Sequence, residues 1–357
     1  MKIGIIGLPQ AGKKTLFGLL TQYVFSEKDL TAGKTVKSFA QIKDPRFDAL
    51  VAMYNPKKQV RAKIDIELLP KLEPETIRKG DIFKDIADFD AVCHIVRAFK
   101  DESVYHINGS VDYERDIESV NSELILNDLL FIEKRIERID DNLKKIKDTA
   151  AMKEKELLFK LKEQLDKELP LRLLDLNAQE EKTIASYPFI TKKKMIIVLN
   201  ISEDELNNEK RIEQLKQKYQ ALDIDIMQAC VKVESEIAKL ETVQERDEFL
   251  EVLGVKEPAI DILMRLCIKA LNLISFFTVR SDEVRQWLIR AGSSAPDAAG
   301  AIHSDLQRGF IRAEVMKYDD LISLGSEADL KQAGKVYLKG KDYIVEDGDI
   351  IEIRFNV

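Results

Sequence analysis

The chain has 357 residues, and at about 150 residues per domain it is long enough for two or three domains with at least one sizeable core. With 45% hydrophobic residues, 33% charged residues and only 15 Gly and 9 Pro, the composition favours long solvated helices and excludes a mainly β or a disordered chain. The net charge of −7 excludes a global attraction to nucleic acid backbones, so we expect no DNA partner and at most a local RNA-binding patch.

The cysteines and the hydropathy pattern exclude two further classes. Cys93, Cys230 and Cys267 do not have the spacing of a disulfide framework or a zinc site, which predicts a reducing compartment. The sequence has no secretory leader pattern, and no apolar run approaches the roughly 18 residues of a membrane span. We therefore expect a cytoplasmic protein without a membrane partner.

The first part of the chain alternates strands and helices. Lys2–Ile6 is an apolar strand that ends at Gly7, and Lys13–Tyr23 has the spacing of a helix. Further apolar strands are predicted at Ala62–Leu69, Ala91–Phe99, Met195–Asn200 and Asp225–Val231. Strands that are apolar at consecutive positions predict a sheet covered on both faces, and thus an α/β layered domain.

A helical hairpin is predicted in the middle of the chain. Apolar residues from Leu129 to Ile146 step by 3, 4, 3, 4 and 3 positions, and the pattern resumes at Leu158, Leu161 and Leu165. The break between the two runs predicts two helices folded back on each other. The hairpin is either a solvated spacer or a docking surface for a partner.

The last part of the chain has a mixed pattern. Asp261–Leu273 is a predicted apolar helix, Phe276–Val279 a strand and Glu283–Ala291 a helix. Lys335–Val357 reads as short strands broken by Gly340 and by a turn at 346–349. These elements predict a compact α+β module.

The segment between the first strand and helix has the features of a phosphate-binding loop. Gly7 and Gly12 allow backbone N–H groups to converge on phosphate oxygens, and Lys13 is placed to reach the β and γ phosphates. The motif requires Ser or Thr after this lysine as a Mg²⁺ ligand, but the chain has Lys14, with Thr15 one residue late. An ordinary glycine-containing turn is the alternative. The predicted phosphate-binding residues are Gln10, Ala11, Gly12, Lys13, Lys14 and Thr15.

Motifs along nearly the whole chain resemble the YchF family, the Obg-like ATPases within the P-loop GTPase class. The loop is similar to the family's GLPNVGKSTLF, DPRFDAL at 44–50 to its DPRLDAL, and DAVCHIVR at 90–97 to its DAICHVVR. The stretches 298–305, 308–315 and 340–357 resemble the TGS domain that closes these proteins.

The resemblance implies an α/β P-loop NTPase fold, a Ras-like G domain, with an α-helical coiled-coil insertion and a C-terminal α+β TGS domain of the ubiquitin-like, β-grasp type. The implied boundaries are 1–120 with 191–274 for the G domain, 121–190 for the insertion and 275–357 for the TGS domain. It also implies a monomer that associates with the ribosome or ribosomal RNA.

A purine base is expected to bind where two predicted strands end. Most GTPases read guanine with NKxD, whereas the YchF family has NxxE, associated with a preference for ATP. Here Asn200-Ile201-Ser202-Glu203 is similar to NxxE, and Cys230-Val231-Lys232 to the next element, usually SAK. The resemblance therefore implies ATP, rather than GTP, as the preferred ligand, and GTP or ADP is the alternative. Asn200 capping a helix after a strand is the alternative. The implied base-binding residues are Asn200, Ile201, Glu203, Cys230, Val231 and Lys232.

The segment that senses the γ phosphate in the family departs from the family pattern. Relatives have DIAGLVKGASKGEG, and here Asp65 matches its Asp while Leu68 takes the place of its Gly. Asp65 and Leu68 are the expected switch II residues, and Asp65 is the expected metal ligand. Glu67 would bring a negative charge toward the phosphates, and Pro70 and Pro74 would stiffen the segment.

The departures at Lys14 and Leu68 favour a nucleotide-binding protein that hydrolyses ATP weakly or not at all, at most a slow ATPase or GTPase with no assigned catalytic residue. Mg²⁺ binding is in doubt, and Lys14 is a candidate replacement for part of its charge. The alternative is a nucleotide-independent adaptor, or an RNA- or ribosome-binding protein acting through the hairpin and the TGS domain. Cys230 is the one cysteine placed to act as a redox sensor.

Overall fold

The computed structural model describes residues 1–27, 29, 34–70, 72, 81–280 and 282–356. The chain forms two compact units, Met1–Ser38 with Asp65–Cys267 and Phe39–Ile64 with Ile268–Val357. Within the described part of the chain, no helix has the length and apolar character needed to cross a membrane.

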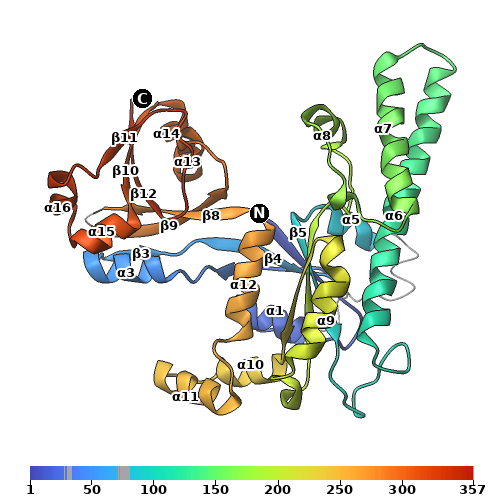
Figure 1. The fold of residues 1–357 in the computed structure, drawn as a ribbon, viewed down its shortest axis with the longest axis horizontal. Helices are drawn as coiled ribbons and strands as arrows, with labels where there is room; N and C mark the ends of the chain where they lie inside the picture. Colours follow the sequence, from blue (N-terminus) through green and yellow to red (C-terminus); the bar gives the residue numbers. More distant parts are fainter. Residues whose placement is uncertain (28, 30–33, 71, 73–80, 281, 357) are drawn as a thin grey trace. The chain divides into compact units, whose positions relative to one another are not determined.

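The first unit is built on a six-stranded sheet in the order β2-β4-β1-β5-β6-β7 (Figure 1). The pairs β1–β4, β1–β5, β5–β6 and β6–β7 are parallel. Its strands are β1 (Lys2–Ile6), β2 (Val36–Gln41), β4 (Lys63–Leu68), β5 (Ala91–Arg97), β6 (Lys194–Asn200) and β7 (Ile224–Ala229). The helices of this part are α1 (Lys13–Thr21), α5 (Asp81–Ala87), α6 (Tyr113–Leu143), α7 (Thr149–Asp166), α8 (Ala178–Ile184), α9 (Glu209–Tyr219), α10 (Val231–Ile237), α11 (Val243–Leu253) and α12 (Ala259–Ala270).

The apolar runs of the sequence form the inner strands of this sheet. Every residue of β5 is buried, as are the last six residues of β6, which confirms the prediction of a sheet covered on both faces. Because all strands paired with β1 and β5 are parallel, their carboxyl ends lie along one edge of the sheet. That edge carries the loop after β1 and the segments that follow β5 and β6.

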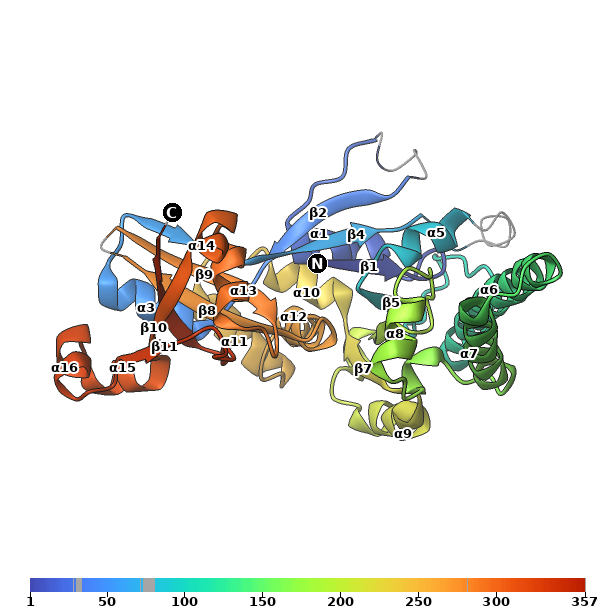
Figure 2. The same ribbon diagram turned by 90° about the horizontal axis from the view of Figure 1, so that it is seen from above.

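The helical hairpin is formed by α6 and α7, which lie side by side in two views (Figures 1 and 2). Ion pairs join Lys155 to Asp140 and Lys162 to Glu133, as antiparallel helices require. The apolar seam encloses a core that includes Ile132, Ile139, Leu158, Leu161 and Leu165, whereas Ile146 near the turn is 72% exposed. The predicted hairpin is confirmed, and its first helix begins at Tyr113.

The second unit is built on a mixed sheet in the order β11-β10-β12-β8-β9-β3. Its strands are β3 (Lys58–Val60), β8 (Leu273–Val279), β9 (Glu283–Arg290), β10 (Phe310–Lys317), β11 (Tyr337–Lys339) and β12 (Asp349–Phe355). The helices are α3 (Pro45–Tyr54), α13 (Ala295–Ile302), α14 (Ser304–Arg308), α15 (Tyr318–Leu324) and α16 (Glu327–Gln332). One core includes Phe276 and the alanines of α13, and a second includes Phe277 with residues of α3, α15 and α16.

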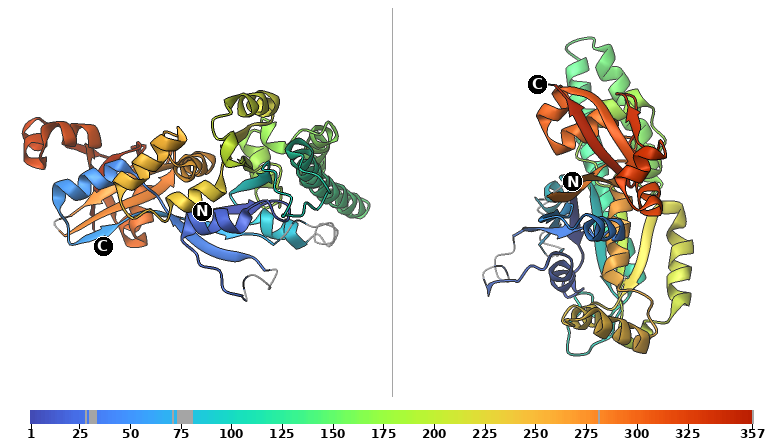
Figure 3. Two further views of the ribbon diagram at one scale, coloured as in Figure 1. Left: turned by 90° about the horizontal axis from the view of Figure 1, so that it is seen from below. Right: turned by 90° about the vertical axis from the view of Figure 1, so that its left-hand side faces the viewer.

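The segment Phe39–Ile64 belongs to this second unit, although the sequence placed residues 1–120 in one domain. Strand β3 pairs in parallel with β9, and both β3 and α3 lie beside β8 and β9 (Figures 1 and 3). The Arg46 guanidinium donates to Asp347 Oδ2 at 2.8 Å and to Asp44 Oδ2 at 2.9 Å. The contact of Arg46 with Asp347 and the pairing of β3 with β9 join residues that are far apart in the sequence, which local patterns do not reveal.

The helix predicted at Glu283–Ala291 is wrong, because these residues form strand β9. The apolar residues Val284, Trp287 and Leu288 have helical spacing, but antiparallel pairing with β8 from end to end decides the conformation. Tertiary pairing here overrides the local pattern.

Candidate functional site

The loop between β1 and α1 has the backbone conformation that its glycines allow. Gly7 has φ 151° and Gly12 has φ 98°, and Gln10 adopts a left-handed φ of 61°. A Cβ on Gly7 would lie 2.3 Å from Ile95 O, and one on Gly12 would lie 2.4 Å from Asn200 Nδ2. Both positions therefore exclude side chains, and the loop packs directly against β5 and the end of β6.

Lys13 lies over this loop as the first residue of α1. Its side chain is buried, and Nζ donates to Gly7 O and, at 3.2 Å, to Leu8 O. A phosphate oxygen approaching the loop would be an acceptor of higher charge for the same ammonium group. Of the other predicted phosphate-binding residues, Gln10, Lys14 and Thr15 are exposed at the start of α1, whereas Ala11 is buried.

Lys14 lies close to an aromatic cluster beyond α1. Its ammonium is 5.9 Å from the centre of the Phe25 ring, and Phe25 packs against Phe17 and Tyr23. Asp29 is near enough for Lys14 to help lower its pKa, after the larger effect of hydrogen bonds from Ser26. A lysine at this position thus has local partners of its own.

Asn200 connects three loops at the edge of the sheet. Its side chain donates to Ala11 O at 3.0 Å and accepts from Val231 N at 3.1 Å. Its main-chain carbonyl accepts from the N–H groups of Ala98 and Phe99, at 2.8 and 2.9 Å. Because Asn200 is 5% exposed, these contacts are shielded from solvent. They join the phosphate loop to the segments that follow β5 and β7.

The other predicted base-binding residues gather around Asn200. Ile201 and Val231 are buried, whereas Glu203 and Lys232 are exposed at the starts of a 3-10 turn and of α10. The charges of Glu203 and Lys232 both act on Cys230, so all three lie close together. The structure therefore brings the residues 200, 201, 203 and 230–232 into one place.

The cysteines are buried in the described structure. Burial raises the pKa of Cys230 and raises that of Cys93 to about 12. A thiol that is protonated and 3% exposed, as Cys230 is, reacts slowly with oxidants, so the expectation of a redox sensor at Cys230 is not supported.

Phe99 contacts Asn200 and was not among the site residues predicted from the sequence. It is half buried directly after β5, its N–H donates to Asn200 O, and its ring lies 4.6 Å from the Arg97 guanidinium carbon. The signal was available in principle, because a polar or aromatic residue directly after a buried parallel strand lies at the carboxyl edge of the sheet. The strand prediction at Ala91–Phe99 had included Phe99 as an ordinary strand residue.

The switch II residues lie elsewhere than predicted. Asp65 pairs with Lys2 in the strand register and its carboxylate lies 3.8 Å from the N-terminal amino group of Met1. Along β1, Lys2 and Ile6 are four residues apart at about 3.3 Å each. Asp65, which pairs with Lys2, is therefore about 13 Å from the start of the phosphate loop. The prediction of Asp65 as a metal ligand is therefore wrong, because the strand register places Asp65 away from the phosphate loop.

Glu67 also faces away from the phosphate loop. Its carboxylate is buried between Lys2, at 3.7 Å, and Lys37, at 3.2 Å. The expectation that Glu67 brings negative charge toward a triphosphate is thus corrected, since these two lysines neutralise it.

The end of β4 beside the loop is apolar. Leu68 pairs with Ile5, Leu69 N donates to Ile5 O at 3.1 Å, and Leu68, Leu69 and Leu72 are all buried. Pro70 follows, while Pro74 and the rest of 73–80 lie outside the described residues.

Within the described residues, Lys14, Asp65 and the end of β4 do not supply the oxygen ligands that Mg²⁺ requires. The Lys14 ammonium has no lone pair to offer, Leu68 and Leu69 have no side-chain oxygen, and Asp65 lies three residues before Leu68, beside Lys2. Across the described ranges, no cluster of three or more His, Cys, Asp or Glu side chains is placed to hold a metal ion.

Sequence comparison shows strong similarity over the whole chain. A ribosome-binding ATPase YchF of Bacillus subtilis is 40% identical over 368 residues, covering 99% of both chains. The chain belongs to the YchF family. An Obg-like ATPase 1 of Caenorhabditis elegans is 35% identical, covering all of this chain and 92% of its own.

Two further comparisons agree with membership of the YchF family. A family model named YchF-GTPase_C, described as a protein of unknown function (DUF933), matches residues 273–356. The solved structure of the Schizosaccharomyces pombe YchF GTPase superposes with a TM-score of 0.85 at 29% identity, covering 99% of this chain and 97% of that one. The predicted fold, a P-loop G domain with a helical insertion and a C-terminal domain, is confirmed.

Proposed function

We propose that this YchF-family protein binds a purine nucleotide, with ATP preferred over GTP, at the carboxyl edge of the first unit's sheet. The observation that carries this proposal is the position of Asn200, whose side chain joins Ala11 of the phosphate loop to Val231 of the base-binding segment. One residue thereby fixes the spacing between a triphosphate group and a base. The phosphate loop and its buried Lys13 supply the charge that binds the phosphates.

The preference for ATP rests on Glu203. Adenine offers an N6 amino donor and an unprotonated N1, whereas guanine offers donors at N1 and N2. Glu203 stands three residues after Asn200, as the Asp of NKxD stands three residues after its Asn, but its side chain is one methylene longer, so its carboxylate meets a different part of the base. An unmatched donor or acceptor costs about 1–3 kcal/mol. We propose that the half-buried ring of Phe99, whose main-chain N–H donates to Asn200 O, packs against the base.

We further propose that nucleotide binding needs little Mg²⁺ and that hydrolysis is weak or absent. Lys14 occupies the position of the metal-binding hydroxyl and adds one positive charge next to the phosphates. Leu68 and Leu69 at the end of β4 offer no side-chain oxygen to orient a metal ion or a water molecule. Loss of such charge stabilisation costs on the order of 10²-fold in rate for each contact.

The proposed macromolecular partner is the ribosome. Relatives such as the Bacillus subtilis protein are named ribosome-binding ATPases, and they match this chain from end to end. The alternative is an adaptor that binds the ribosome without nucleotide, through the helical hairpin or the second unit.

Calorimetric titration of nucleotide-free protein with ATP and GTP, each with and without Mg²⁺, tests the nucleotide proposal. We expect ATP to bind about tenfold more tightly than GTP, as one mismatched hydrogen bond requires, with little change when Mg²⁺ is added. Equal affinity for the two nucleotides contradicts the role of Glu203. Absence of binding by either nucleotide favours the adaptor.

Cosedimentation with ribosomal subunits, with and without ATP across a salt series, tests the partner. A steep loss of binding with salt indicates contact with RNA phosphates, and a flat response indicates contact with ribosomal protein. Binding that is identical with and without ATP supports the adaptor, and no binding contradicts the ribosome as partner.

A further inference from the structure

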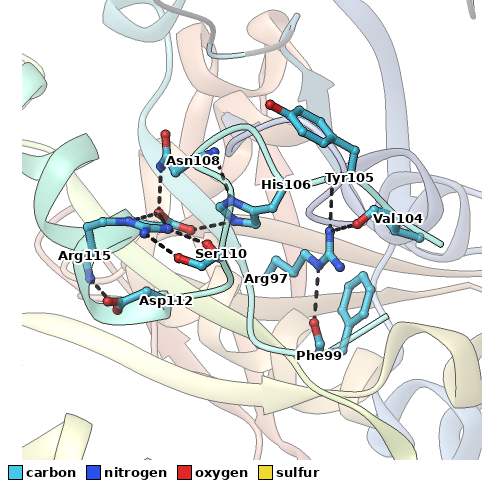
Figure 4. Close-up of polar contacts among 10 residues, drawn as sticks. Arg97, Phe99, Val104, Tyr105, His106, Asn108, Ser110, Asp112 and Arg115 are labelled. Carbon is cyan, nitrogen blue, oxygen red and sulfur yellow. Dashed lines mark hydrogen bonds and ion pairs between the residues drawn. The ribbon is translucent and has the colours of Figure 1, made fainter. Parts of the chain in front are cut away.

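Arg97, the last residue of β5, is buried among main-chain carbonyl groups. Its guanidinium donates to Phe99 O at 3.2 Å, Val104 O at 3.0 Å, Tyr105 O at 3.3 Å and Asp101 O at 3.0 Å. The residue is only 3% exposed, and Figure 4 shows the side chain enclosed by the loop that follows β5. These contacts fold residues 98–105 around one side chain.

The start of this loop is part of the candidate nucleotide site. Arg97 lies opposite Asn200 in the strand register, and Ala98 and Phe99 both donate to Asn200 O. The Phe99 ring lies against the guanidinium that also binds the Phe99 carbonyl. Arg97 therefore fixes both the main chain and the ring of Phe99.

The far end of the loop is anchored separately. His106 Nε2 lies 3.0 Å from Asp116 Oδ2, and Arg115 binds Asp116 Oδ1 at 2.9 Å and Ser110 O at 2.7 Å (Figure 4). His106 and Asp116 are buried, and both are near the start of α6. The segment after residue 105 is thus held by the start of α6, whereas Arg97 holds residues 99–105 through their main-chain carbonyls.

We infer that Arg97 is a positioning residue for base recognition: it holds the loop 98–105 so that Phe99 faces the purine beside Asn200. The inference rests on the proposed nucleotide binding. It adds the residue that makes the binding affinity depend on the base as well as on the phosphates. Arg97 makes its contacts with the loop after β5, whereas Lys13 contacts the phosphate loop. Removing the Arg97 contacts is therefore expected to weaken recognition of the base and leave recognition of the phosphates unchanged.

The test compares ATP with inorganic tripolyphosphate, which has the phosphates but no base. Lysine is a compact charge that does not offer the planar, forked donors of a guanidinium. In Arg97→Lys we expect ATP affinity to fall by about tenfold, with tripolyphosphate affinity unchanged, since lost contacts of this kind have effects of that order. Equal losses for the two ligands overturn the inference.

Arg172→Lys is the matched control. The Arg172 guanidinium also donates to main-chain carbonyls, at 2.8 Å to Leu222 O and 3.3 Å to Thr191 O, but these belong to the segments that precede β6 and β7. We expect this variant to lose stability as Arg97→Lys does while keeping the ratio of ATP affinity to tripolyphosphate affinity. A changed ratio in the control shows that the effect is not specific to Arg97.

A double-mutant cycle with Phe99→Ala tests whether Arg97 acts through Phe99. If it does, Arg97→Lys adds no further loss of ATP affinity in a Phe99→Ala background. If the two substitutions lower ATP affinity by factors that multiply in the double variant, the inference is overturned. Failure of the proposed function is distinguished from these outcomes, because unaltered protein then binds neither ATP nor tripolyphosphate.

Hydrogen exchange of the unaltered protein keeps the inference testable if Arg97→Lys does not fold. ATP is expected to slow amide exchange in residues 98–105, and tripolyphosphate is expected to leave it unchanged. If residues 98–105 exchange at the same rate with ATP as with tripolyphosphate, a role for this loop in base recognition is contradicted.

Discussion

Two neighbouring parallel strands, β1 and β4, end side by side with opposite chemistry. After β1 the chain turns through Gly7 and Gly12 and presents Lys13 and Lys14, whereas β4 ends in the buried Leu68 and Leu69. Asp65 and Glu67, the acidic residues of β4, contact the N-terminal amino group, Lys2 and Lys37 instead. The difference teaches that two adjacent strands of one sheet can end in a glycine loop with lysines and in an apolar segment, which is why the proposal separates nucleotide binding from hydrolysis.

The largest effect is expected at the end of β1. Lys13→Ala removes the buried ammonium that lies over the phosphate loop, and ATP affinity is expected to fall about 100-fold, as for a charge-assisted contact. Calorimetric titration measures this change. Retained ATP binding in Lys13→Ala would show that the loop after β1 is not the phosphate site.

The next effect concerns His94 on β5, which pairs with Ile6 at the end of β1. Among the described residues its Nδ1 has no hydrogen-bond partner, and burial, with a smaller effect of Lys13, lowers its pKa from 6.5 to about 3. Below pH 6.5 the unfolded chain therefore binds a proton that the folded chain does not. At pH 5 this linkage favours unfolding by about 2 kcal/mol.

His94→Leu is expected to flatten the decline in the free energy of unfolding between pH 6.5 and pH 5, measured by urea denaturation. His303 is 64% exposed in its side chain, so His303→Leu serves as a control that should keep the decline. An unchanged pH dependence in His94→Leu means that His94 is not buried in a neutral state.

Lys14→Ser tests whether the lysine replaces part of the metal charge. The serine restores a hydroxyl ligand and removes the positive charge, so Mg²⁺ is expected to raise ATP affinity by about tenfold in the variant and to change it little in the unaltered protein. Titrations of both proteins with ATP, at a series of Mg²⁺ concentrations, provide the comparison. The same Mg²⁺ response in both proteins would sink the proposal for Lys14.

The smallest effect is expected at Asp65 in β4. Asp65→Asn should leave ATP affinity and its Mg²⁺ response unchanged, because Asp65 pairs with Lys2 at the far end of the strand. Its ion pair with the N-terminus is exposed, so the free energy of unfolding is expected to fall by about 0.5 kcal/mol or less. A loss of Mg²⁺-dependent ATP binding in this variant would restore Asp65 as a metal ligand.

The sequence predicted the features that local patterns encode. The loop after β1 and the hairpin of α6 and α7 each have a short, repeated or glycine-dependent signature, and both are present. The clustering of Asn200, Glu203 and Cys230 followed from the resemblance to the family and from the ends of parallel strands meeting at one edge.

What the sequence did not reveal depends on pairing between distant segments. The register that places Asp65 opposite Lys2 is fixed by strand pairing, and a shift of a few residues moves a carboxylate from one end of a sheet to the other. Arg97 was hidden for a similar reason, since its partners are main-chain carbonyls, which leave no signature in the sequence. The helix predicted for β9 failed because its partner strand decides its conformation.

The inclusion of Phe39–Ile64 in the second unit has a consequence during synthesis. The pairing of β3 with β9 joins Lys58 to Glu283, so this early segment leaves the ribosome more than two hundred residues before its partner strand. At about 5–20 residues per second, the delay is on the order of 10–45 s. Throughout that interval the apolar side of α3, with Phe47 and Leu50, lacks the sheet that buries it in the finished protein. In the nascent chain, the segment Phe39–Ile64 therefore cannot complete its fold until β9 has been synthesised.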